Sequence, residues 1–153
     1  MVFESNFNFG VSAFTWKNYI RCFDLYEQVT IRKLNYIKKE EAHQILLNFV
    51  KKNLGKKYEI SAAKLLKFET DLNWDEINRE KERGYFCSEL IAKALKSLGL
   101  IEGKVSSSRF WPVDFSEKNG LMLKKGAWLG PEQTIILKKH LKNVLWWTAF
   151  FQI

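Results

Sequence analysis

Cys87 is the residue whose type and position are best suited to covalent chemistry. It opens a predicted helix that runs toward Gly99. At a helix N-terminus, the first backbone N–H groups and the positive end of the helix dipole stabilise a thiolate and can lower the pKa of a cysteine. A cysteine in this position is therefore a candidate nucleophile for acyl transfer. The residues alone leave a second interpretation open, because a cysteine between Phe86 and Leu90 is also typical of a small buried hydrophobic side chain.

The composition gives little support to metal or disulfide chemistry. The chain holds two cysteines, Cys22 and Cys87, and two histidines, His43 and His140. These residues cannot form a four-ligand zinc site of the usual spacing or a disulfide framework. We therefore expect no bound metal and no cofactor, and the free cysteines favour a cytoplasmic location. The sequence also has no secretory signal pattern and no continuous apolar stretch of the roughly 18–20 residues that a membrane span needs.

The chain is strongly basic. Its 153 residues include 25 lysines and arginines against 17 acidic residues, which gives a formal net charge of +8. This charge favours anionic partners such as phosphates, nucleic acid or acidic lipid. The lysine pairs at 38–39, 51–52, 56–57 and 124–125 are scattered and are not interleaved with aromatic residues on one face. That distribution argues against a nucleic-acid interface.

Two helices are marked by their apolar spacing and by the glycines that follow them. Apolar residues recur at three- and four-residue steps from Glu40 to Leu54, and Gly55 comes next. The helix that Cys87 opens is followed by Gly99. A glycine at positive φ there, with Leu100 closing against Leu95, would form a Schellman motif.

Strands are expected on both sides of these helices. The segment 1–11 has the pattern of a strand that runs into a turn, and Val29 to Arg32 alternates with the period of a half-buried strand. Residues 121–123 and 134–137 are further strand candidates, so the second half of the chain is expected to be rich in strands. With 46% hydrophobic residues, the sequence predicts one α+β domain over residues 1–153, with helices packed on a small antiparallel sheet.

Five short pieces, taken in order along the chain, resemble the permuted papain-like peptidases and amidases of the NlpC superfamily. They are Val2-Phe3-Glu4-Ser5 with Gly10-Val11, the stretch Val29 to Leu34, Leu54-Gly55-Lys56-Lys57-Tyr58-Glu59, Gly84-Tyr85-Phe86-Cys87-Ser88-Glu89-Leu90-Ile91 with Leu98-Gly99-Leu100, and Phe110-Trp111-Pro112-Val113-Asp114-Phe115. The resemblance spans residues 1 to about 137. It implies a permuted papain-like fold without its first strand, and a thiol hydrolase that acts on amide or peptide bonds.

The resemblance also implies roles for individual residues. By that correspondence Cys87 is the catalytic nucleophile, and Glu4 is the acidic residue that orients an imidazole. Glu89 falls on the family's Cys-Ser-Glu-Leu pattern in the first turn of the helix, and we interpret it as structural. Members of the family act on peptides, on amides or on the acyl groups of lipids, so the resemblance leaves the substrate open.

The family's histidine has no counterpart in this sequence. It would precede Glu4, where only three residues stand. His43 lies at the edge of the apolar stripe of its helix and His140 lies among lysines, so neither matches the family's position. Without this base, amide hydrolysis would be severely impaired. Either Met1 is an internal methionine of a longer protein, which we favour because a missing strand would expose a sheet edge, or the chain is a shortened, inactive member.

Residues 138–153 form a basic and aromatic tail. Its members include Lys138, Lys139, Lys142, Trp146, Trp147, Phe150 and Phe151. Aromatic side chains beside lysines are typical of segments that bind an anionic membrane surface, although packing on the core is the simpler interpretation. The alternative function is thus a non-catalytic domain of the same fold that binds a membrane surface or a protein. The sequence leaves the oligomeric state open.

Overall fold

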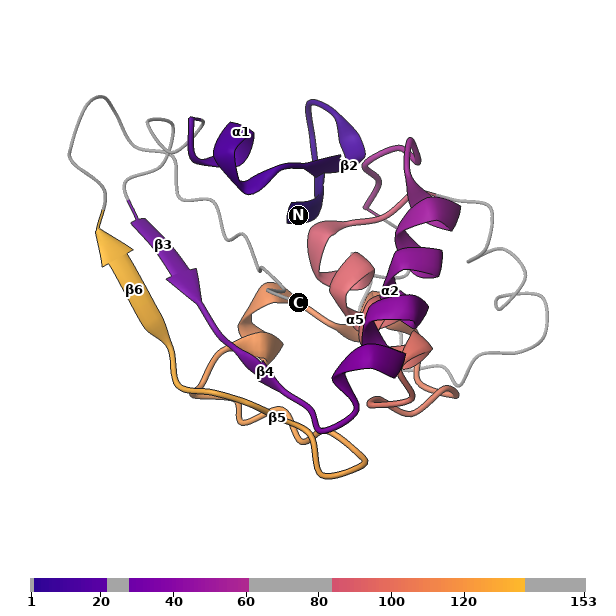
Figure 1. The fold of residues 1–153 in the computed structure, drawn as a ribbon, viewed down its shortest axis with the longest axis vertical. Helices are drawn as coiled ribbons and strands as arrows, with labels where there is room; N and C mark the ends of the chain where they lie inside the picture. Colours follow the sequence, from indigo (N-terminus) through magenta and orange to yellow (C-terminus); the bar gives the residue numbers. More distant parts are fainter. Residues whose placement is uncertain (1, 22–27, 61–83, 137–153) are drawn as a thin grey trace.

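A hairpin of two antiparallel strands, β1 (Val2–Asn6) and β2 (Gly10–Phe14), lies at the upper end of the molecule in Figure 1. The computed structural model describes residues 2–21, 28–60 and 84–136. The side-chain oxygen of Asn6 accepts hydrogen bonds from the backbone N–H groups of Asn8 (3.1 Å) and Phe9 (2.8 Å), which fixes the turn. Gly10 has a φ of +64°, and a Cβ there would overlap the carbonyl oxygen of Lys56, so this position requires glycine.

Two further antiparallel ladders join the first part of the chain to the last described part. β3 (Gln28–Ile31) pairs with β6 (Gln133–Ile136), and β4 (Leu34–Asn35) pairs with β5 (Trp128–Leu129). Arg32 lies between β3 and β4. Its guanidinium donates to the carbonyl oxygens of Gly130 (2.6 Å), Leu129 (2.9 Å) and Phe115 (3.0 Å), so one side chain ties three segments together.

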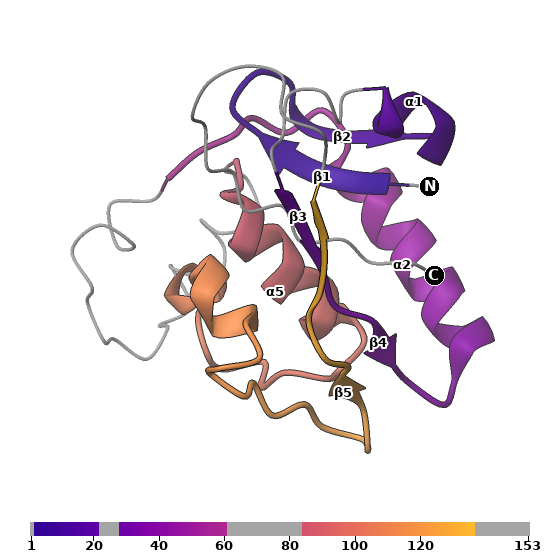
Figure 2. The same ribbon diagram turned by 90° about the vertical axis from the view of Figure 1, so that its left-hand side faces the viewer.

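The two long helices, α2 (Lys39–Asn53) and α5 (Cys87–Ser97), lie side by side and run in opposite directions (Figures 1 and 2). The end of α2 therefore lies near the beginning of α5. The backbone N–H of Gly99 donates to Lys96 and that of Leu100 donates to Leu95, with Gly99 at a φ of +67°. This is the predicted Schellman motif, and it confirms the expected end of the helix.

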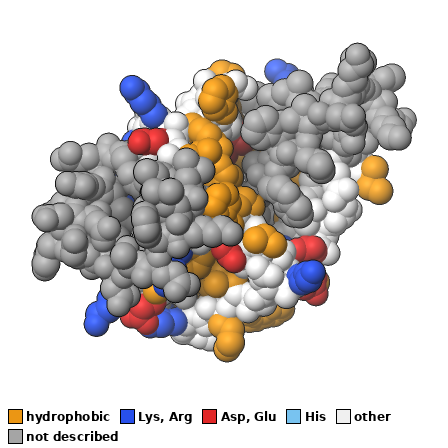
Figure 3. Space-filling view, turned by 180° about the vertical axis from the view of Figure 1, so that it is seen from behind, with side chains coloured by type: hydrophobic (Ala, Val, Ile, Leu, Met, Phe, Trp, Pro, Cys, Tyr) orange, Lys and Arg blue, Asp and Glu red, His pale blue; other side chains and the backbone are white. Residues whose placement is uncertain are grey.

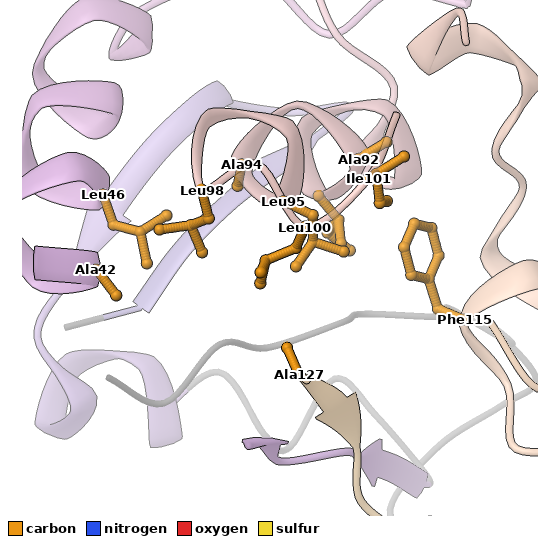
Figure 4. Packing of buried hydrophobic residues seen from close by; sticks show 11 residues of the cluster. Ala42, Leu46, Ala92, Ala94, Leu95, Leu98, Leu100, Ile101, Phe115 and Ala127 are labelled. Atoms are coloured by element: carbon orange, nitrogen blue, oxygen red, sulfur yellow. The ribbon is translucent and has the colours of Figure 1, made fainter. Parts of the chain in front are cut away.

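The main core lies between α5, α2 and the β4–β5 ladder. Its buried hydrophobic residues are Ala42, Leu46, Ile91, Ala92, Ala94, Leu95, Leu98, Leu100, Ile101, Phe115 and Ala127 (Figure 4). A smaller cluster of Val11, Tyr85 and Leu90 packs against Phe3 and Phe49 under the hairpin. Burial of these side chains holds the N-terminal part of α5 against the hairpin.

The predicted α+β class is confirmed: the described residues contain helices and small antiparallel sheets. The expected strand at 121–123 is wrong. Leu121 and Leu123 pack against the main core and Met122 is exposed, so the alternation is real, but within the described residues no strand pairs with 121–123. The expected richness in strands is also wrong for residues 101–127, which contain two short 3₁₀ helices, η2 (Ser107–Arg109) and η3 (Pro112–Phe115).

A short helix that the sequence pattern does not predict, α1 (Trp16–Ile20), follows β2. Its N-cap is Thr15, whose hydroxyl accepts a 3.3 Å hydrogen bond from the backbone N–H of Asn18. Among the described residues, none of the helices has the length and hydropathy needed to cross a bilayer.

Candidate functional site

Cys87 is the first residue of α5 and its side chain is half-buried. The preceding residue, Phe86, is extended (φ −71°, ψ 152°) and forms the N-cap. The side chain of Glu89 is fully buried, and its carboxylate accepts a 3.3 Å hydrogen bond from the backbone N–H of Phe86. Glu89 therefore satisfies a backbone donor at the helix N-terminus, which is the structural role expected for it.

The segment 55–59 places a second set of groups beside Cys87. Its backbone lies between β2 and the residues that lead into α5: the N–H of Val11 donates to Lys56 (2.7 Å) and the N–H of Tyr85 donates to Lys57 (2.9 Å). A Cβ at Gly84 would overlap the carbonyl oxygen of Lys57. Segment 55–59 and the residues before α5 therefore approach more closely than any residue other than glycine at position 84 would allow.

Tyr58 packs its ring against that of Phe86, the residue before Cys87, and its hydroxyl interacts electrostatically with Cys87 and Glu89. Burial, and to a smaller extent the negative charges of Cys87 and Glu89, raise the pKa of the Tyr58 hydroxyl to about 12. The hydroxyl therefore stays protonated at neutral pH and can donate a hydrogen bond to an oxygen that develops negative charge next to Cys87. Tyr58 belongs to the Leu54-to-Glu59 piece of the family resemblance. Its interaction with Cys87, 29 positions further along the chain, cannot be predicted from local residue spacing.

A row of aromatic rings lies beside Cys87. Phe7 and Tyr58 have ring centroids 6.1 Å apart, Tyr58 and Phe86 are 5.5 Å apart, and Phe86 and Trp111 are 6.1 Å apart. We call these four residues the ring row. The backbone that carries Trp111 is held to α5 because the hydroxyl of Ser88 donates a 2.6 Å hydrogen bond to the carbonyl oxygen of Phe110. The ring row gives one side of the site an apolar wall.

Glu4 lies on β1 with its side chain only 7% exposed. Its carboxylate accepts a hydrogen bond from the side-chain amide of Asn6, and burial raises its pKa above the ordinary value. The adjacent Ser5 donates to Tyr85, and successive strand side chains point to opposite faces, so Glu4 faces away from Tyr85. Among the described residues no hydrogen bond joins Glu4 to Cys87, and its implied role stays a prediction.

His43 lies at the far end of the helix pair from Cys87. Its neighbours Ala42 and Leu46 pack beside Leu98, just beyond the end of α5 (Figure 4). An 11-residue helix such as α5 is about 16 Å long, so this region is well beyond hydrogen-bond distance of Cys87. The structure thus does not bring His43 to the site. His140, Cys22 and the tail 138–153 lie outside the described residues.

The described residues also contain an open pocket of about 590 Å³ near η2 and η3. Arg109, Asp114 and Lys118 are among the side chains that line it, and Cys87 is not. No group of three or more histidine, cysteine or carboxylate side chains in the described ranges is arranged to hold a metal ion. The groups that the described site brings together are the Cys87 thiol, the N-terminus of α5 and the Tyr58 hydroxyl.

Comparison of the chain with protein-family models, with curated proteins and with solved structures finds no match. The resemblance to the permuted papain-like peptidases and amidases therefore depends on the residues of this chain alone, and it enters below as a proposal.

Proposed function

We propose that the chain is a thiol hydrolase of the permuted papain-like type, with Cys87 as the nucleophile that attacks the acyl carbon of an amide, a peptide or an acyl ester. The observation that carries the proposal is the position of Cys87: a half-buried thiol at the first residue of an eleven-residue helix, beside the protonated hydroxyl of Tyr58. A nucleophile, a helix N-terminus and a neutral donor are the groups that acyl transfer through cysteine uses.

The chemical step follows from this arrangement. The thiolate of Cys87 forms a bond to the acyl carbon, and the carbonyl oxygen becomes negatively charged. The first backbone N–H groups of α5 and the Tyr58 hydroxyl are the groups that would stabilise this oxygen. The bond to the leaving amine or alcohol then breaks, and the leaving group takes up the proton that the Cys87 thiol gave up. Water cleaves the resulting thioester, which releases the carboxylic acid and regenerates the thiol.

Proton transfer in this step calls for an imidazole, which the resemblance assigns to a strand next to β1. In the described part of the chain β1 pairs only with β2, so its other edge is open to such a strand. Glu4 would then be a positioning residue for that imidazole. Acylation or alkylation of Cys87 does not require the imidazole, so it can be tested separately from turnover.

The test is the rate at which iodoacetamide alkylates Cys87 as a function of pH, measured by mass spectrometry in a Cys22→Ser background. An activated thiol reacts with a midpoint below about 8.5, the value of an ordinary cysteine. The double variant with Cys87→Ser should show no alkylation at all. A midpoint at or above 8.5 would contradict the proposal, because the thiol would then have no activation by its surroundings.

A second measurement tests the role of Tyr58. With p-nitrophenyl acetate as acyl donor, Tyr58→Phe should lower the rate of acetylation of Cys87 by about tenfold or more, since it removes one donor to the oxyanion. The alkylation rate with iodoacetamide, which forms no oxyanion, should change little. Equal loss in both reactions would show that Tyr58 only supports the fold of the site.

A further inference from the structure

The upper end of the molecule carries several exposed large apolar side chains. This end is formed by the β1–β2 turn, α1 and the segment that follows α2, and both views show the three together (Figures 1 and 2). Its exposed large hydrophobic residues are Phe7 (74%), Phe9 (70%), Trp16 (49%) and Leu54 (47%). Figure 3 shows exposed hydrophobic side chains in a band down one face that reaches this end. Phe7 and Phe9, two exposed aromatic rings on one turn, are the candidate interaction surface at this end.

Phe7 and Phe9 project from a turn that is already rigid. Asn6 holds the turn through the backbone N–H groups of Asn8 and Phe9, and Gly10 packs directly on the backbone of Lys56. Little conformational freedom is therefore lost when these two rings are buried by a partner. We call Phe7 and Phe9 the aromatic tip.

The charges around the aromatic tip are mostly positive. The basic residues of segments 2–21 and 51–60 are Lys17, Arg21, Lys51, Lys52, Lys56 and Lys57, and the acidic ones are Glu4 and Glu59. Glu4 is buried, whereas the side chain of Lys57 is exposed. The hydrogen bonds from Val11 to Lys56 and from Gly55 to Val11 hold the backbone of segment 55–57 beside the tip. The ammonium of Lys56 donates a 3.0 Å hydrogen bond to the hydroxyl of the buried Tyr85, so Lys57 is the exposed cation of the pair. An apolar tip with surrounding cations is complementary to a surface that is apolar inside and anionic outside.

We infer that the aromatic tip docks the protein on an anionic lipid bilayer, with Phe7 and Phe9 in the interfacial layer and the neighbouring lysines at the headgroups. This inference is independent of the proposed hydrolase activity and of the tail 138–153. Phe7 is also the first member of the ring row, so a docked tip would bring the Cys87 side of the molecule next to the bilayer.

The test is sedimentation of the full chain with two kinds of vesicle, phosphatidylcholine alone and an equal mixture of phosphatidylcholine and phosphatidylserine. The wild-type chain should bind the mixed vesicles, and added salt should weaken binding because it screens the lysines. The double variant Phe7→Ala with Phe9→Ala should lower the partition coefficient by about tenfold or more, as expected for two large apolar side chains.

A matched control is the double variant Ile37→Ala with Met122→Ala, which removes two apolar side chains that are 85% and 90% exposed elsewhere on the molecule. Its binding should stay within about twofold of wild type. Both double variants keep the tail, so any contribution of the tail cancels. Lys57→Glu should also weaken binding and reduce its dependence on salt.

Two outcomes would overturn the inference. The first is equal binding of the tip variant and the control variant, which would place any membrane contact elsewhere. The second is a wild-type chain that does not bind mixed vesicles but self-associates through the tip, seen as a dimer in analytical ultracentrifugation that the tip variant lacks. That result would assign the tip to a second copy of the chain.

Discussion

The hydroxyl of Ser5 donates a 2.6 Å hydrogen bond to the carbonyl oxygen of Tyr85, and this buried contact joins β1 to the residue two positions before Cys87. Ser5→Ala leaves that carbonyl without its short hydrogen bond. We expect the free energy of unfolding to fall by about 1–3 kcal/mol, measured by urea denaturation. Ser97→Ala is the control, because the hydroxyl of Ser97 belongs to an exposed residue in α5 and its loss should cost little. Equal losses in the two variants would contradict this account.

Gly84 sets how closely the approach to α5 packs on segment 55–59. Gly84→Ala introduces a Cβ that overlaps the carbonyl oxygen of Lys57, whereas Gly103→Ala meets nothing within 4 Å. We expect Gly84→Ala to lower the free energy of unfolding by about 1–3 kcal/mol or more, and Gly103→Ala to change it by less than about 0.5 kcal/mol. Thermal and urea denaturation of the two variants would measure the difference, and a stable Gly84→Ala protein would show that the two segments separate easily.

The buried carboxyl of Glu4 makes the stability of the fold depend on pH. Its pKa is raised above the ordinary value of 4.5 in the folded state, chiefly by burial. Between 4.5 and the raised pKa the folded state holds more protons than the unfolded state, so the free energy of unfolding decreases as the pH rises through this window. Glu4→Gln lacks the ionisation and should lose this slope. Urea denaturation across the window, with Glu40→Gln at an exposed position as control, would detect it.

We expect the carboxylate of Glu89, two residues after Cys87 in the first turn of α5, to act against the helix N-terminus on the Cys87 thiol. Its carboxylate lies near enough to Tyr58 to raise the pKa of that hydroxyl, and Cys87 acts on the same hydroxyl. A negative charge at Glu89 disfavours the thiolate, so Glu89→Gln should move the midpoint of Cys87 alkylation to lower pH. The amide oxygen can still accept from Phe86 and keep the cap. An unchanged midpoint would mean that the carboxylate is screened from the sulfur.

Local sequence patterns were sufficient for the two long helices. Gly55 and Gly99 follow helices whose apolar spacing spans at least three turns. The apolar spacing predicts each helix, and the glycine independently predicts where it ends. Short elements were harder. α1 has five residues and β5 has two, which is too few for a periodic pattern to be distinguished from chance. At 121–123 the alternation reflects packing of Leu121 and Leu123 without a ladder.

The candidate site could be predicted only in part, because some of its contacts join segments far apart in the chain. The position of Cys87 at a helix start follows from neighbouring residues. The approach of Tyr58 depends on the bonds between segment 55–59, β2 and Tyr85, which are contacts between segments far apart in the chain. The direction in which Glu4 points depends on strand register, because a shift of one residue would turn it to the other face.

The β3–β6 ladder pairs Thr30 with Thr134, residues 104 positions apart. A chain that emerges from the ribosome at about 5–20 residues per second therefore exposes β3 for roughly 5–20 s before β6 has been made. Arg32, which follows β3, cannot form its hydrogen bonds to the carbonyl oxygens of Leu129 and Gly130 until those residues have been made. The β3 strand therefore cannot pair until residues 133–136 have been made, and until then its edge is the segment that a nascent-chain chaperone would have to protect.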